Sequence, residues 1–89
     1  MSAPTAVAAS DVAVVLALAN VNRRGLIIYN DTDRALYVKL GADATLDSWT
    51  AKLYKDDVYE LPSPIYTGEV TGIWDAGVGG RAMVTESVL

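Results

Sequence analysis

The chain has 89 residues, of which 11 are acidic and 7 basic, so its formal net charge is −4 at pH 7. This balance disfavours nucleic acid as a partner, because phosphate binding requires clustered lysines and arginines. The chain contains no histidine and no cysteine, which excludes disulfides, thiolate chemistry, thiolate metal sites and the commonest general base near neutral pH.

The first ten residues are small, mostly apolar and uncharged. They contain few strong formers of either secondary structure, so we expect residues 1–10 to be a flexible arm. The segment lacks the basic and continuous apolar regions of a secretory signal. The longest apolar run, Val12 to Ala19, has eight residues, whereas a membrane-spanning helix needs about 20. We therefore expect no membrane as a partner.

The first patterned segment runs from Asp11 to Ala19. Large apolar side chains at Val12, Val14, Leu16 and Leu18 alternate with mostly smaller ones. An alanine-rich helix is the alternative, because alanine and leucine both favour helices. The β-branched valines favour a strand, which is the interpretation we adopt.

The next two segments predict a hairpin. Leu26 to Tyr29 is a continuous apolar run that is too short for a helix, so we expect a central strand buried on both faces. Asn30 to Asp33 has the composition of a turn. Ala35 to Leu40 then alternates, with Tyr37 on the outer face. The two strands are expected to pair around a loop near residues 30–34.

Four further segments are predicted to be strands, at residues 48–53, 58–61, 69–74 and 81–86. In the first, Trp49 is expected to face the core. In the third, Trp74 is a core residue, and Gly72 permits close approach of a neighbour. The glycine-rich residues 77–80 predict a hairpin loop between the last two strands.

Together these segments make about seven strands spaced roughly ten residues apart, which is typical of an antiparallel sandwich or small barrel. We expect an all-β protein with a small antiparallel β-sandwich, of jelly-roll or Ig-like type. Residues 11–89 would form this single domain, preceded by the N-terminal arm.

Paired carboxylates are the remaining candidates for catalysis or calcium binding. The pairs are Asp31 with Asp33, Asp43 with Asp47, and Asp56 with Asp57. Each pair falls in a predicted turn, where aspartate is favoured for its local hydrogen bonds. An 89-residue sandwich also has little room for a substrate cleft beside its core. We therefore expect no catalytic, cofactor-binding or metal-binding residue, and a protein that is not an enzyme.

Five residues are candidates for a partner interface: Arg23, Arg24, Tyr37, Tyr54 and Tyr66. The two adjacent arginines are either a solvated strand start or a contact to an acidic neighbouring subunit. Tyr37 and Tyr54 fall on predicted outer faces, where exposed aromatic rings often mark a sugar- or protein-binding surface.

The order of several short motifs resembles a known family. Residues 20–30 read N-x-N-R-x-G-L-x-I-Y-N, and residues 36–41 read L-Y-V-x-L-G. Y-E-L-P follows at residues 59–62, and Y-T-G at residues 66–68 precedes G-I-W at residues 72–74. This combination is similar to small all-β modules in virion proteins of tailed bacteriophages. Residues 62–65 depart from that pattern.

The resemblance implies a non-enzymatic structural part of a phage virion, of capsid decoration or head-fibre type. The major capsid protein or another virion protein would be its partner, with self-association into a dimer or trimer. The protein would be found on the capsid surface or an associated structure, and in the host cytoplasm during assembly. Alternatives are a fibre, neck or tail-associated adaptor, or a carbohydrate-binding host-attachment module. In the capsid role, the arm at residues 1–10 would suit strand addition, or ordering on binding, against the shell or a neighbouring subunit, and the domain is expected to fold without it.

Overall fold

The computed structural model describes residues 2–77 and 79–88, and these contain eight β-strands and no helix. The all-β prediction is confirmed, and no helix in these two ranges could span a membrane. The strands are β1 (Ser2–Ala8), β2 (Val14–Ala17), β3 (Arg23–Asp31), β4 (Leu36–Leu40), β5 (Ala51–Leu53), β6 (Val58–Glu60), β7 (Val70–Trp74) and β8 (Arg81–Val88).

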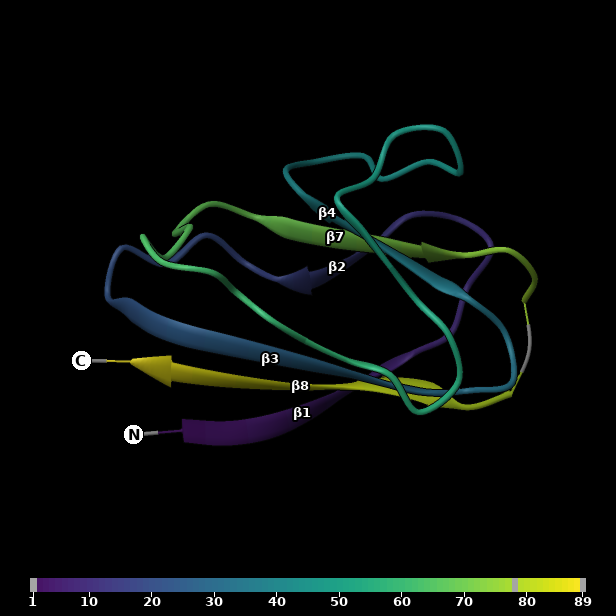
Figure 1. Ribbon diagram of the computed structural model, residues 1–89, viewed down its shortest axis with the longest axis horizontal. Coiled ribbons are helices and arrows are strands. Elements are labelled where there is room, and N and C mark those ends of the chain that lie inside the picture. The colour runs from purple at the N-terminus through teal and green to yellow at the C-terminus, as the bar shows by residue number, and fades with distance from the viewer. Residues whose placement is uncertain (1, 78, 89) are drawn as a thin grey trace.

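The strands form two four-stranded antiparallel sheets that pack as a sandwich (Figure 1). Sheet A has the order β1-β8-β3-β6, and sheet B has the order β2-β7-β4-β5. In chain order, β1 pairs with β8, β2 with β7, β3 with β6 and β4 with β5. These nested pairs are those of a long hairpin rolled into two sheets. Of the two expected types of sandwich, the fold is therefore the jelly roll.

The core lies between the two sheets and follows the period-two alternation of the strands. Its largest completely buried side chains include Leu26 and Ile28 from sheet A, and Leu36 and Trp74 from sheet B. At Gly72, a Cβ atom would lie 2.8 Å from Leu16 Cδ1. The predicted positions of Trp74 and Gly72 in the core are thus confirmed.

The predicted hairpin between residues 26–29 and 35–40 is wrong. β3 lies in sheet A and β4 in sheet B, and β3 is already paired on both edges, with β8 and with β6. No edge of β3 remains for β4. The expectation of two buried faces is also wrong, because Leu26 and Ile28 are buried whereas Ile27 between them is 41% exposed.

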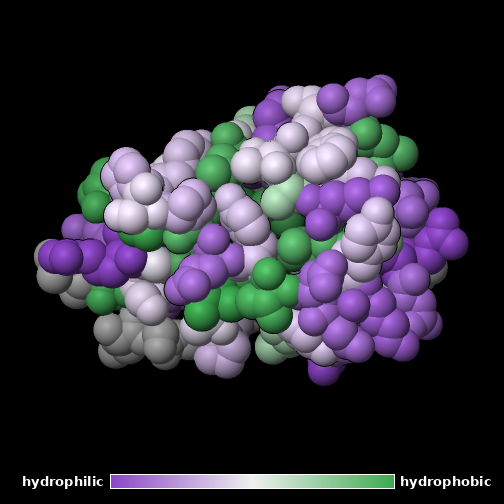
Figure 2. All heavy atoms as spheres, in the orientation of Figure 1, coloured by the Kyte–Doolittle hydropathy of each residue, from purple (hydrophilic) through white to green (hydrophobic). Residues whose placement is uncertain are grey.

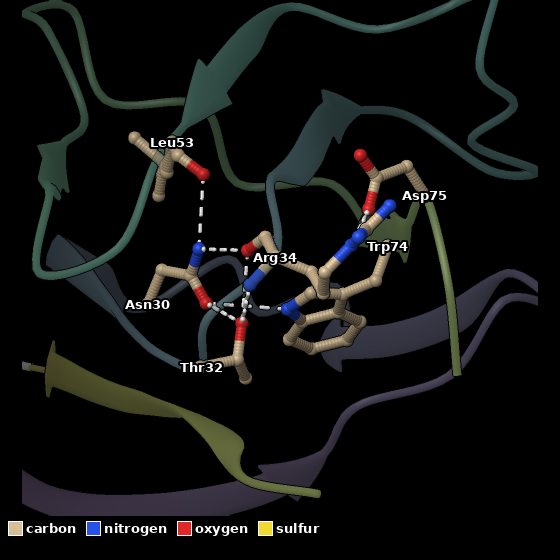
Figure 3. A network of polar contacts seen from close by, with 6 residues as sticks. All are labelled: Asn30, Thr32, Arg34, Leu53, Trp74 and Asp75. Atoms are coloured by element: carbon tan, nitrogen blue, oxygen red, sulfur yellow. Dashed lines mark hydrogen bonds and ion pairs between the residues drawn. The ribbon is translucent and has the colours of Figure 1, made fainter. Parts of the chain in front are cut away.

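Asn30 directs the chain from sheet A to sheet B (Figure 3). Its side chain is completely buried, and Nδ2 donates to the carbonyl oxygens of Arg34 at 2.7 Å and Leu53 at 2.9 Å. Oδ1 accepts hydrogen bonds from Thr32 Oγ1 at 2.8 Å and Trp74 Nε1 at 3.2 Å. This segment has the polar residues of a turn, but their hydrogen bonds join the two sheets instead of closing a hairpin.

The prediction of a flexible arm at residues 1–10 is wrong, because Ser2–Ala8 form the edge strand β1. From Ser2 to Ala8, β1 pairs continuously with β8, and Val7 packs against the core. Backbone pairing requires no particular side chains, so this short segment of small residues can form a strand wherever a free sheet edge is near. Met1 lies outside the described residues.

The predictions for residues 11–19 and for residues 77–80 also need correction. The predicted strand at residues 11–19 is confirmed over Val14–Ala17 only, and Leu18 beyond it is 72% exposed. The glycine-rich segment at residues 77–80 does not close a hairpin, because β7 and β8 belong to different sheets. Val78 within it lies outside the described residues.

Candidate partner-binding surface

Four side chains form a continuous row on the outer face of sheet B. Tyr37 on β4 and Lys52 on β5 are directly opposite each other, and Lys52 Nζ lies 5.2 Å from the centre of the Tyr37 ring. The same Nζ lies 5.0 Å from the centre of the Tyr54 ring. At the other end, Trp49 meets Tyr37 edge-on, with ring centroids 5.4 Å apart. We call these four residues the aromatic ladder.

Strand alternation and the loop before β5 hold the ladder in place. Leu36 and Val38 are buried, so Tyr37 between them points outward. Trp49 precedes β5, and its indole Nε1 donates to the Leu46 carbonyl oxygen at 3.1 Å. A cation held over aromatic rings is attracted by their quadrupoles. The row is therefore ordered before any partner binds.

The expectation that Trp49 faces the core is wrong. The alternation of residues 48–53 predicts a strand over the whole segment, but β5 contains only Ala51–Leu53. Trp49 lies in the preceding loop and is 43% exposed, and Tyr54 just after β5 is 59% exposed. The outward prediction is confirmed for Tyr37 and Tyr54.

The ladder carries positive charge in an acidic protein. Four of the seven basic side chains form ion pairs, namely Arg23, Arg34, Lys55 and Arg81. Within residues 2–77 and 79–88, no ion pair is found for Lys39 or Lys52. Lys39 follows Tyr37 by two residues and so shares its face of β4. Hydrogen bonding to Tyr37 and then to Tyr54 raises the pKa of Lys52. Like that of an ordinary lysine, this amine is protonated at neutral pH.

Arg23 belongs to the interior of the molecule. It is 3% exposed, and its Nε donates to Glu86 Oε2 at 2.7 Å. Its Nη1 donates to the carbonyl oxygens of Tyr66 at 2.8 Å and Gly68 at 3.0 Å, and its Nη2 to that of Leu18 at 2.7 Å. The Arg23 guanidinium thus contacts the β2–β3 connection, the β6–β7 connection and β8 at once.

The two arginines therefore do not form a basic pair on the surface. A register shift between Arg23 and Gly25 turns the Arg23 side chain inward, while Arg24 is exposed. Tyr66 is half-buried and packs against the core. Of the five residues chosen from the sequence, the structure brings Tyr37 and Tyr54 together. Trp49, Lys52 and Lys39 were missed, although the alternation of β4 and β5 marks both lysines as outward-facing.

The aspartates of two of the three pairs, Asp31 with Asp33 and Asp56 with Asp57, have structural contacts. Asp31 faces Arg81 at 3.6 Å and Asp33 faces Lys55 at 2.9 Å. Asp56 Oδ1 accepts a hydrogen bond from the Tyr29 hydroxyl at 2.5 Å, and Asp57 Oδ2 accepts one from the Tyr54 amide at 2.9 Å. In the described part of the chain, no three acidic side chains are grouped so that they could hold a metal ion.

Other exposed apolar side chains lie both on strands and in the connections between them. On the strands, Val15, Ile27 and Val58 are 43%, 41% and 58% exposed. In the connections, Val12, Leu18 and Val21 are 68%, 72% and 86% exposed. Figure 2 shows hydrophobic residues gathered near the middle of the face it draws, with a mostly hydrophilic right-hand end. Single exposed apolar residues are normal in soluble proteins. The aromatic ladder differs from them because its members contact one another and combine aromatic surface with positive charge.

Comparison with protein-family models, with curated proteins and with solved structures found no match to this chain.

Proposed function

We propose that this protein is a non-enzymatic structural component of a tailed-phage virion, which binds an acidic surface of the capsid shell through the aromatic ladder. The observation that carries the proposal is the ladder itself, a pre-ordered row of rings around Lys52 with Lys39 on the same face of β4. Neither lysine forms an ion pair within the residues that the structure describes. The ladder lies on a molecule whose net charge is −4.

The composition of the ladder suits protein binding. Tryptophan and tyrosine are enriched among the residues that dominate binding energy at interfaces. Because Lys52 and Trp49 are already held by their neighbours, little side-chain entropy is lost when a partner covers them. The lysines would steer an acidic partner to this face of the sandwich.

Two further arguments favour a virion as the setting. The motif order of residues 20–74 resembles that of small phage virion modules, and jelly rolls occur in viral capsid and lectin domains. The second argument is an analogy of fold and adds only modest weight. On a symmetric shell, many copies of a weak contact would together resist expansion of the shell.

The proposal is tested with purified heads of the phage that encodes the chain, stripped of this protein. Cosedimentation measures how much protein rebinds to the heads. We expect saturable binding that weakens as salt is raised, because the lysine contribution is screened. Replacing Trp49 and Tyr54 together with alanine is expected to reduce affinity by at least about 100-fold, as for two interface hot spots.

Val12→Ala is the control, since Val12 is also an exposed apolar residue, 68% exposed, but lies outside the ladder. This variant should bind heads like the unmodified protein. Absence of binding to heads, or equal binding by the ladder variant, would rule out the proposed attachment surface.

A carbohydrate-binding role is the second candidate, favoured by the exposure of the Trp49 and Tyr54 rings. Sugars stack on such rings through their apolar faces. Titration calorimetry with neutral and acidic sugars up to millimolar concentration separates the two candidates. Heat that is released by a sugar and lost in the Trp49→Ala variant would favour host attachment over shell binding.

A further inference from the structure

The two sheets have four edges, and one of them differs from the rest. The edge strands β2, β5 and β6 are only three or four residues long. Short edge strands are a common protection against pairing with another chain. β1 has seven residues, none of them charged, and it lies at the outer edge of sheet A (Figure 1). It is therefore the edge best suited to accept a further strand.

The register shows which backbone groups of β1 point away from β8. The Ala9 amide donates to the Gly80 carbonyl oxygen at 3.2 Å, and the pairing of Ala8 with Arg81 continues this register into the strand. Backbone groups of successive residues in a strand point to opposite edges. Pro4, Ala6 and Ala8 therefore direct their backbone groups outward, and Pro4 has its missing N–H on the open side, where proline is tolerated.

We propose that β1 pairs with β1 of a second copy of this chain, antiparallel and about a two-fold axis near Ala6. The two sheets A would then form one continuous eight-stranded sheet. At the axis, each Ala6 amide would donate to the Ala6 carbonyl oxygen of the other copy. On either side, the Ala8 amide would donate to the carbonyl oxygen of Pro4. The inference is independent of the proposed function, because it involves neither the aromatic ladder nor a shell.

Three features favour a second copy as the occupant of this edge. Antiparallel pairing of a strand with itself satisfies the two-fold symmetry of the commonest dimers. Identical side chains meet at such an axis, where bulk or charge would be unfavourable, and Ala6 is small and neutral. The chain as a whole repels its copies through its net charge of −4, and an uncharged strand is where that repulsion is least.

Sedimentation velocity over a range of concentrations tests the proposal. A single strand edge buries less than the about 1,200 Å² of a stable interface, so we expect dimers at concentrations on the order of 100 µM. Ala6→Pro removes the outward amide while leaving the hydrogen bonds to β8 intact. Because the dimer loses two hydrogen bonds, its dissociation constant should rise at least about tenfold. Ala6→Ser keeps the amide and should dimerise like the unmodified protein.

A second measurement covers the case in which Ala6→Pro disturbs the fold. The chain has no cysteine, so an Ala6→Cys variant places one thiol beside the axis, within reach of its mate. Under mild oxidation it should form a covalent dimer much faster than an Ala42→Cys variant, whose residue is exposed in the β4–β5 connection. A monomer at all concentrations, dimers that persist unchanged in folded Ala6→Pro, or equal crosslinking of the two cysteine variants would each overturn the proposal.

Discussion

At the scale of single residues, Arg23 makes four side-chain hydrogen bonds from a buried position. Its side chain is completely buried, and the Glu86 carboxylate that it pairs with is 29% exposed. A buried guanidinium is tolerated when every donor direction has an acceptor. Here the acceptors include carbonyl oxygens from two different connections. Arg23 therefore determines how the β2–β3 and β6–β7 connections lie against sheet A.

We predict that Arg23→Ala lowers the free energy of unfolding by about 3 kcal/mol, because three carbonyls and one carboxylate lose their donor. Such a loss is a large fraction of the about 5–10 kcal/mol expected for a domain of this size. Urea denaturation followed by tryptophan fluorescence measures it. The neighbouring Arg24→Ala should change stability by less than about 0.5 kcal/mol, since Arg24 is exposed. Equal effects of the two substitutions would contradict the structural role of Arg23.

At the scale of elements, β7 shows how a residue without a side chain lets the strands on either side of it fill the core. It is the neighbour of both β2 and β4, and Gly72 lies at its centre, where the side chains of Leu16 and Leu36 converge. A Cβ atom at Gly72 would lie 2.8 Å from Leu16 Cδ1 and 3.0 Å from Leu36 Cδ1. The missing side chain is what allows the two leucines to fill this part of the core.

We predict that Gly72→Ala destabilises the protein by about 1–3 kcal/mol through overpacking. For a domain of this size, that corresponds to a fall in Tm of roughly 5–20 °C, measurable by thermal unfolding followed by circular dichroism. Gly79→Ala is the control, because no heavy atom lies within 4 Å of a Cβ at that position. If Gly72→Ala were as stable as Gly79→Ala, the core around Leu16 would be looser than the contacts indicate.

At the scale of the whole molecule, the jelly roll is a nested set of strand pairs. The innermost pair, β4 with β5, is close in sequence, and the outermost, β1 with β8, joins opposite ends of the chain. The two termini accordingly lie side by side (Figure 1). Closing the outermost pair requires ordering the longest loop, which is the most costly in chain entropy.

Deletion of residues 2–8 tests this arrangement. The sequence alone predicts a domain that folds without its first ten residues. From the burial of Val7 and the hydrogen bonds to β8, we expect the free energy of unfolding to fall by about 3–5 kcal/mol when β1 is deleted. Chemical denaturation of the shortened chain measures the loss. An unchanged free energy of unfolding would show that β1 adds nothing to the stability of the folded domain.

The sequence by itself determined the features that depend on neighbours along the chain. Alternation at Leu36, Tyr37 and Val38 predicted a half-buried strand with Tyr37 outside, and the absence of side-chain bulk at Gly72 predicted close packing. These predictions are correct because the period of a strand and the size of a side chain are local properties.

Only the tertiary structure decided which strands pair and which faces are exposed. The pairing of β3 with β8 and β6 involves backbone groups that every residue carries, so the residues between β3 and β4 gave no sign that these strands separate into two sheets. The inward turn of Arg23 depends on a register shift against β8. Likewise, Trp49 joins the ladder because β5 begins two residues after it. These outcomes depend on contacts between distant segments, which local patterning does not specify.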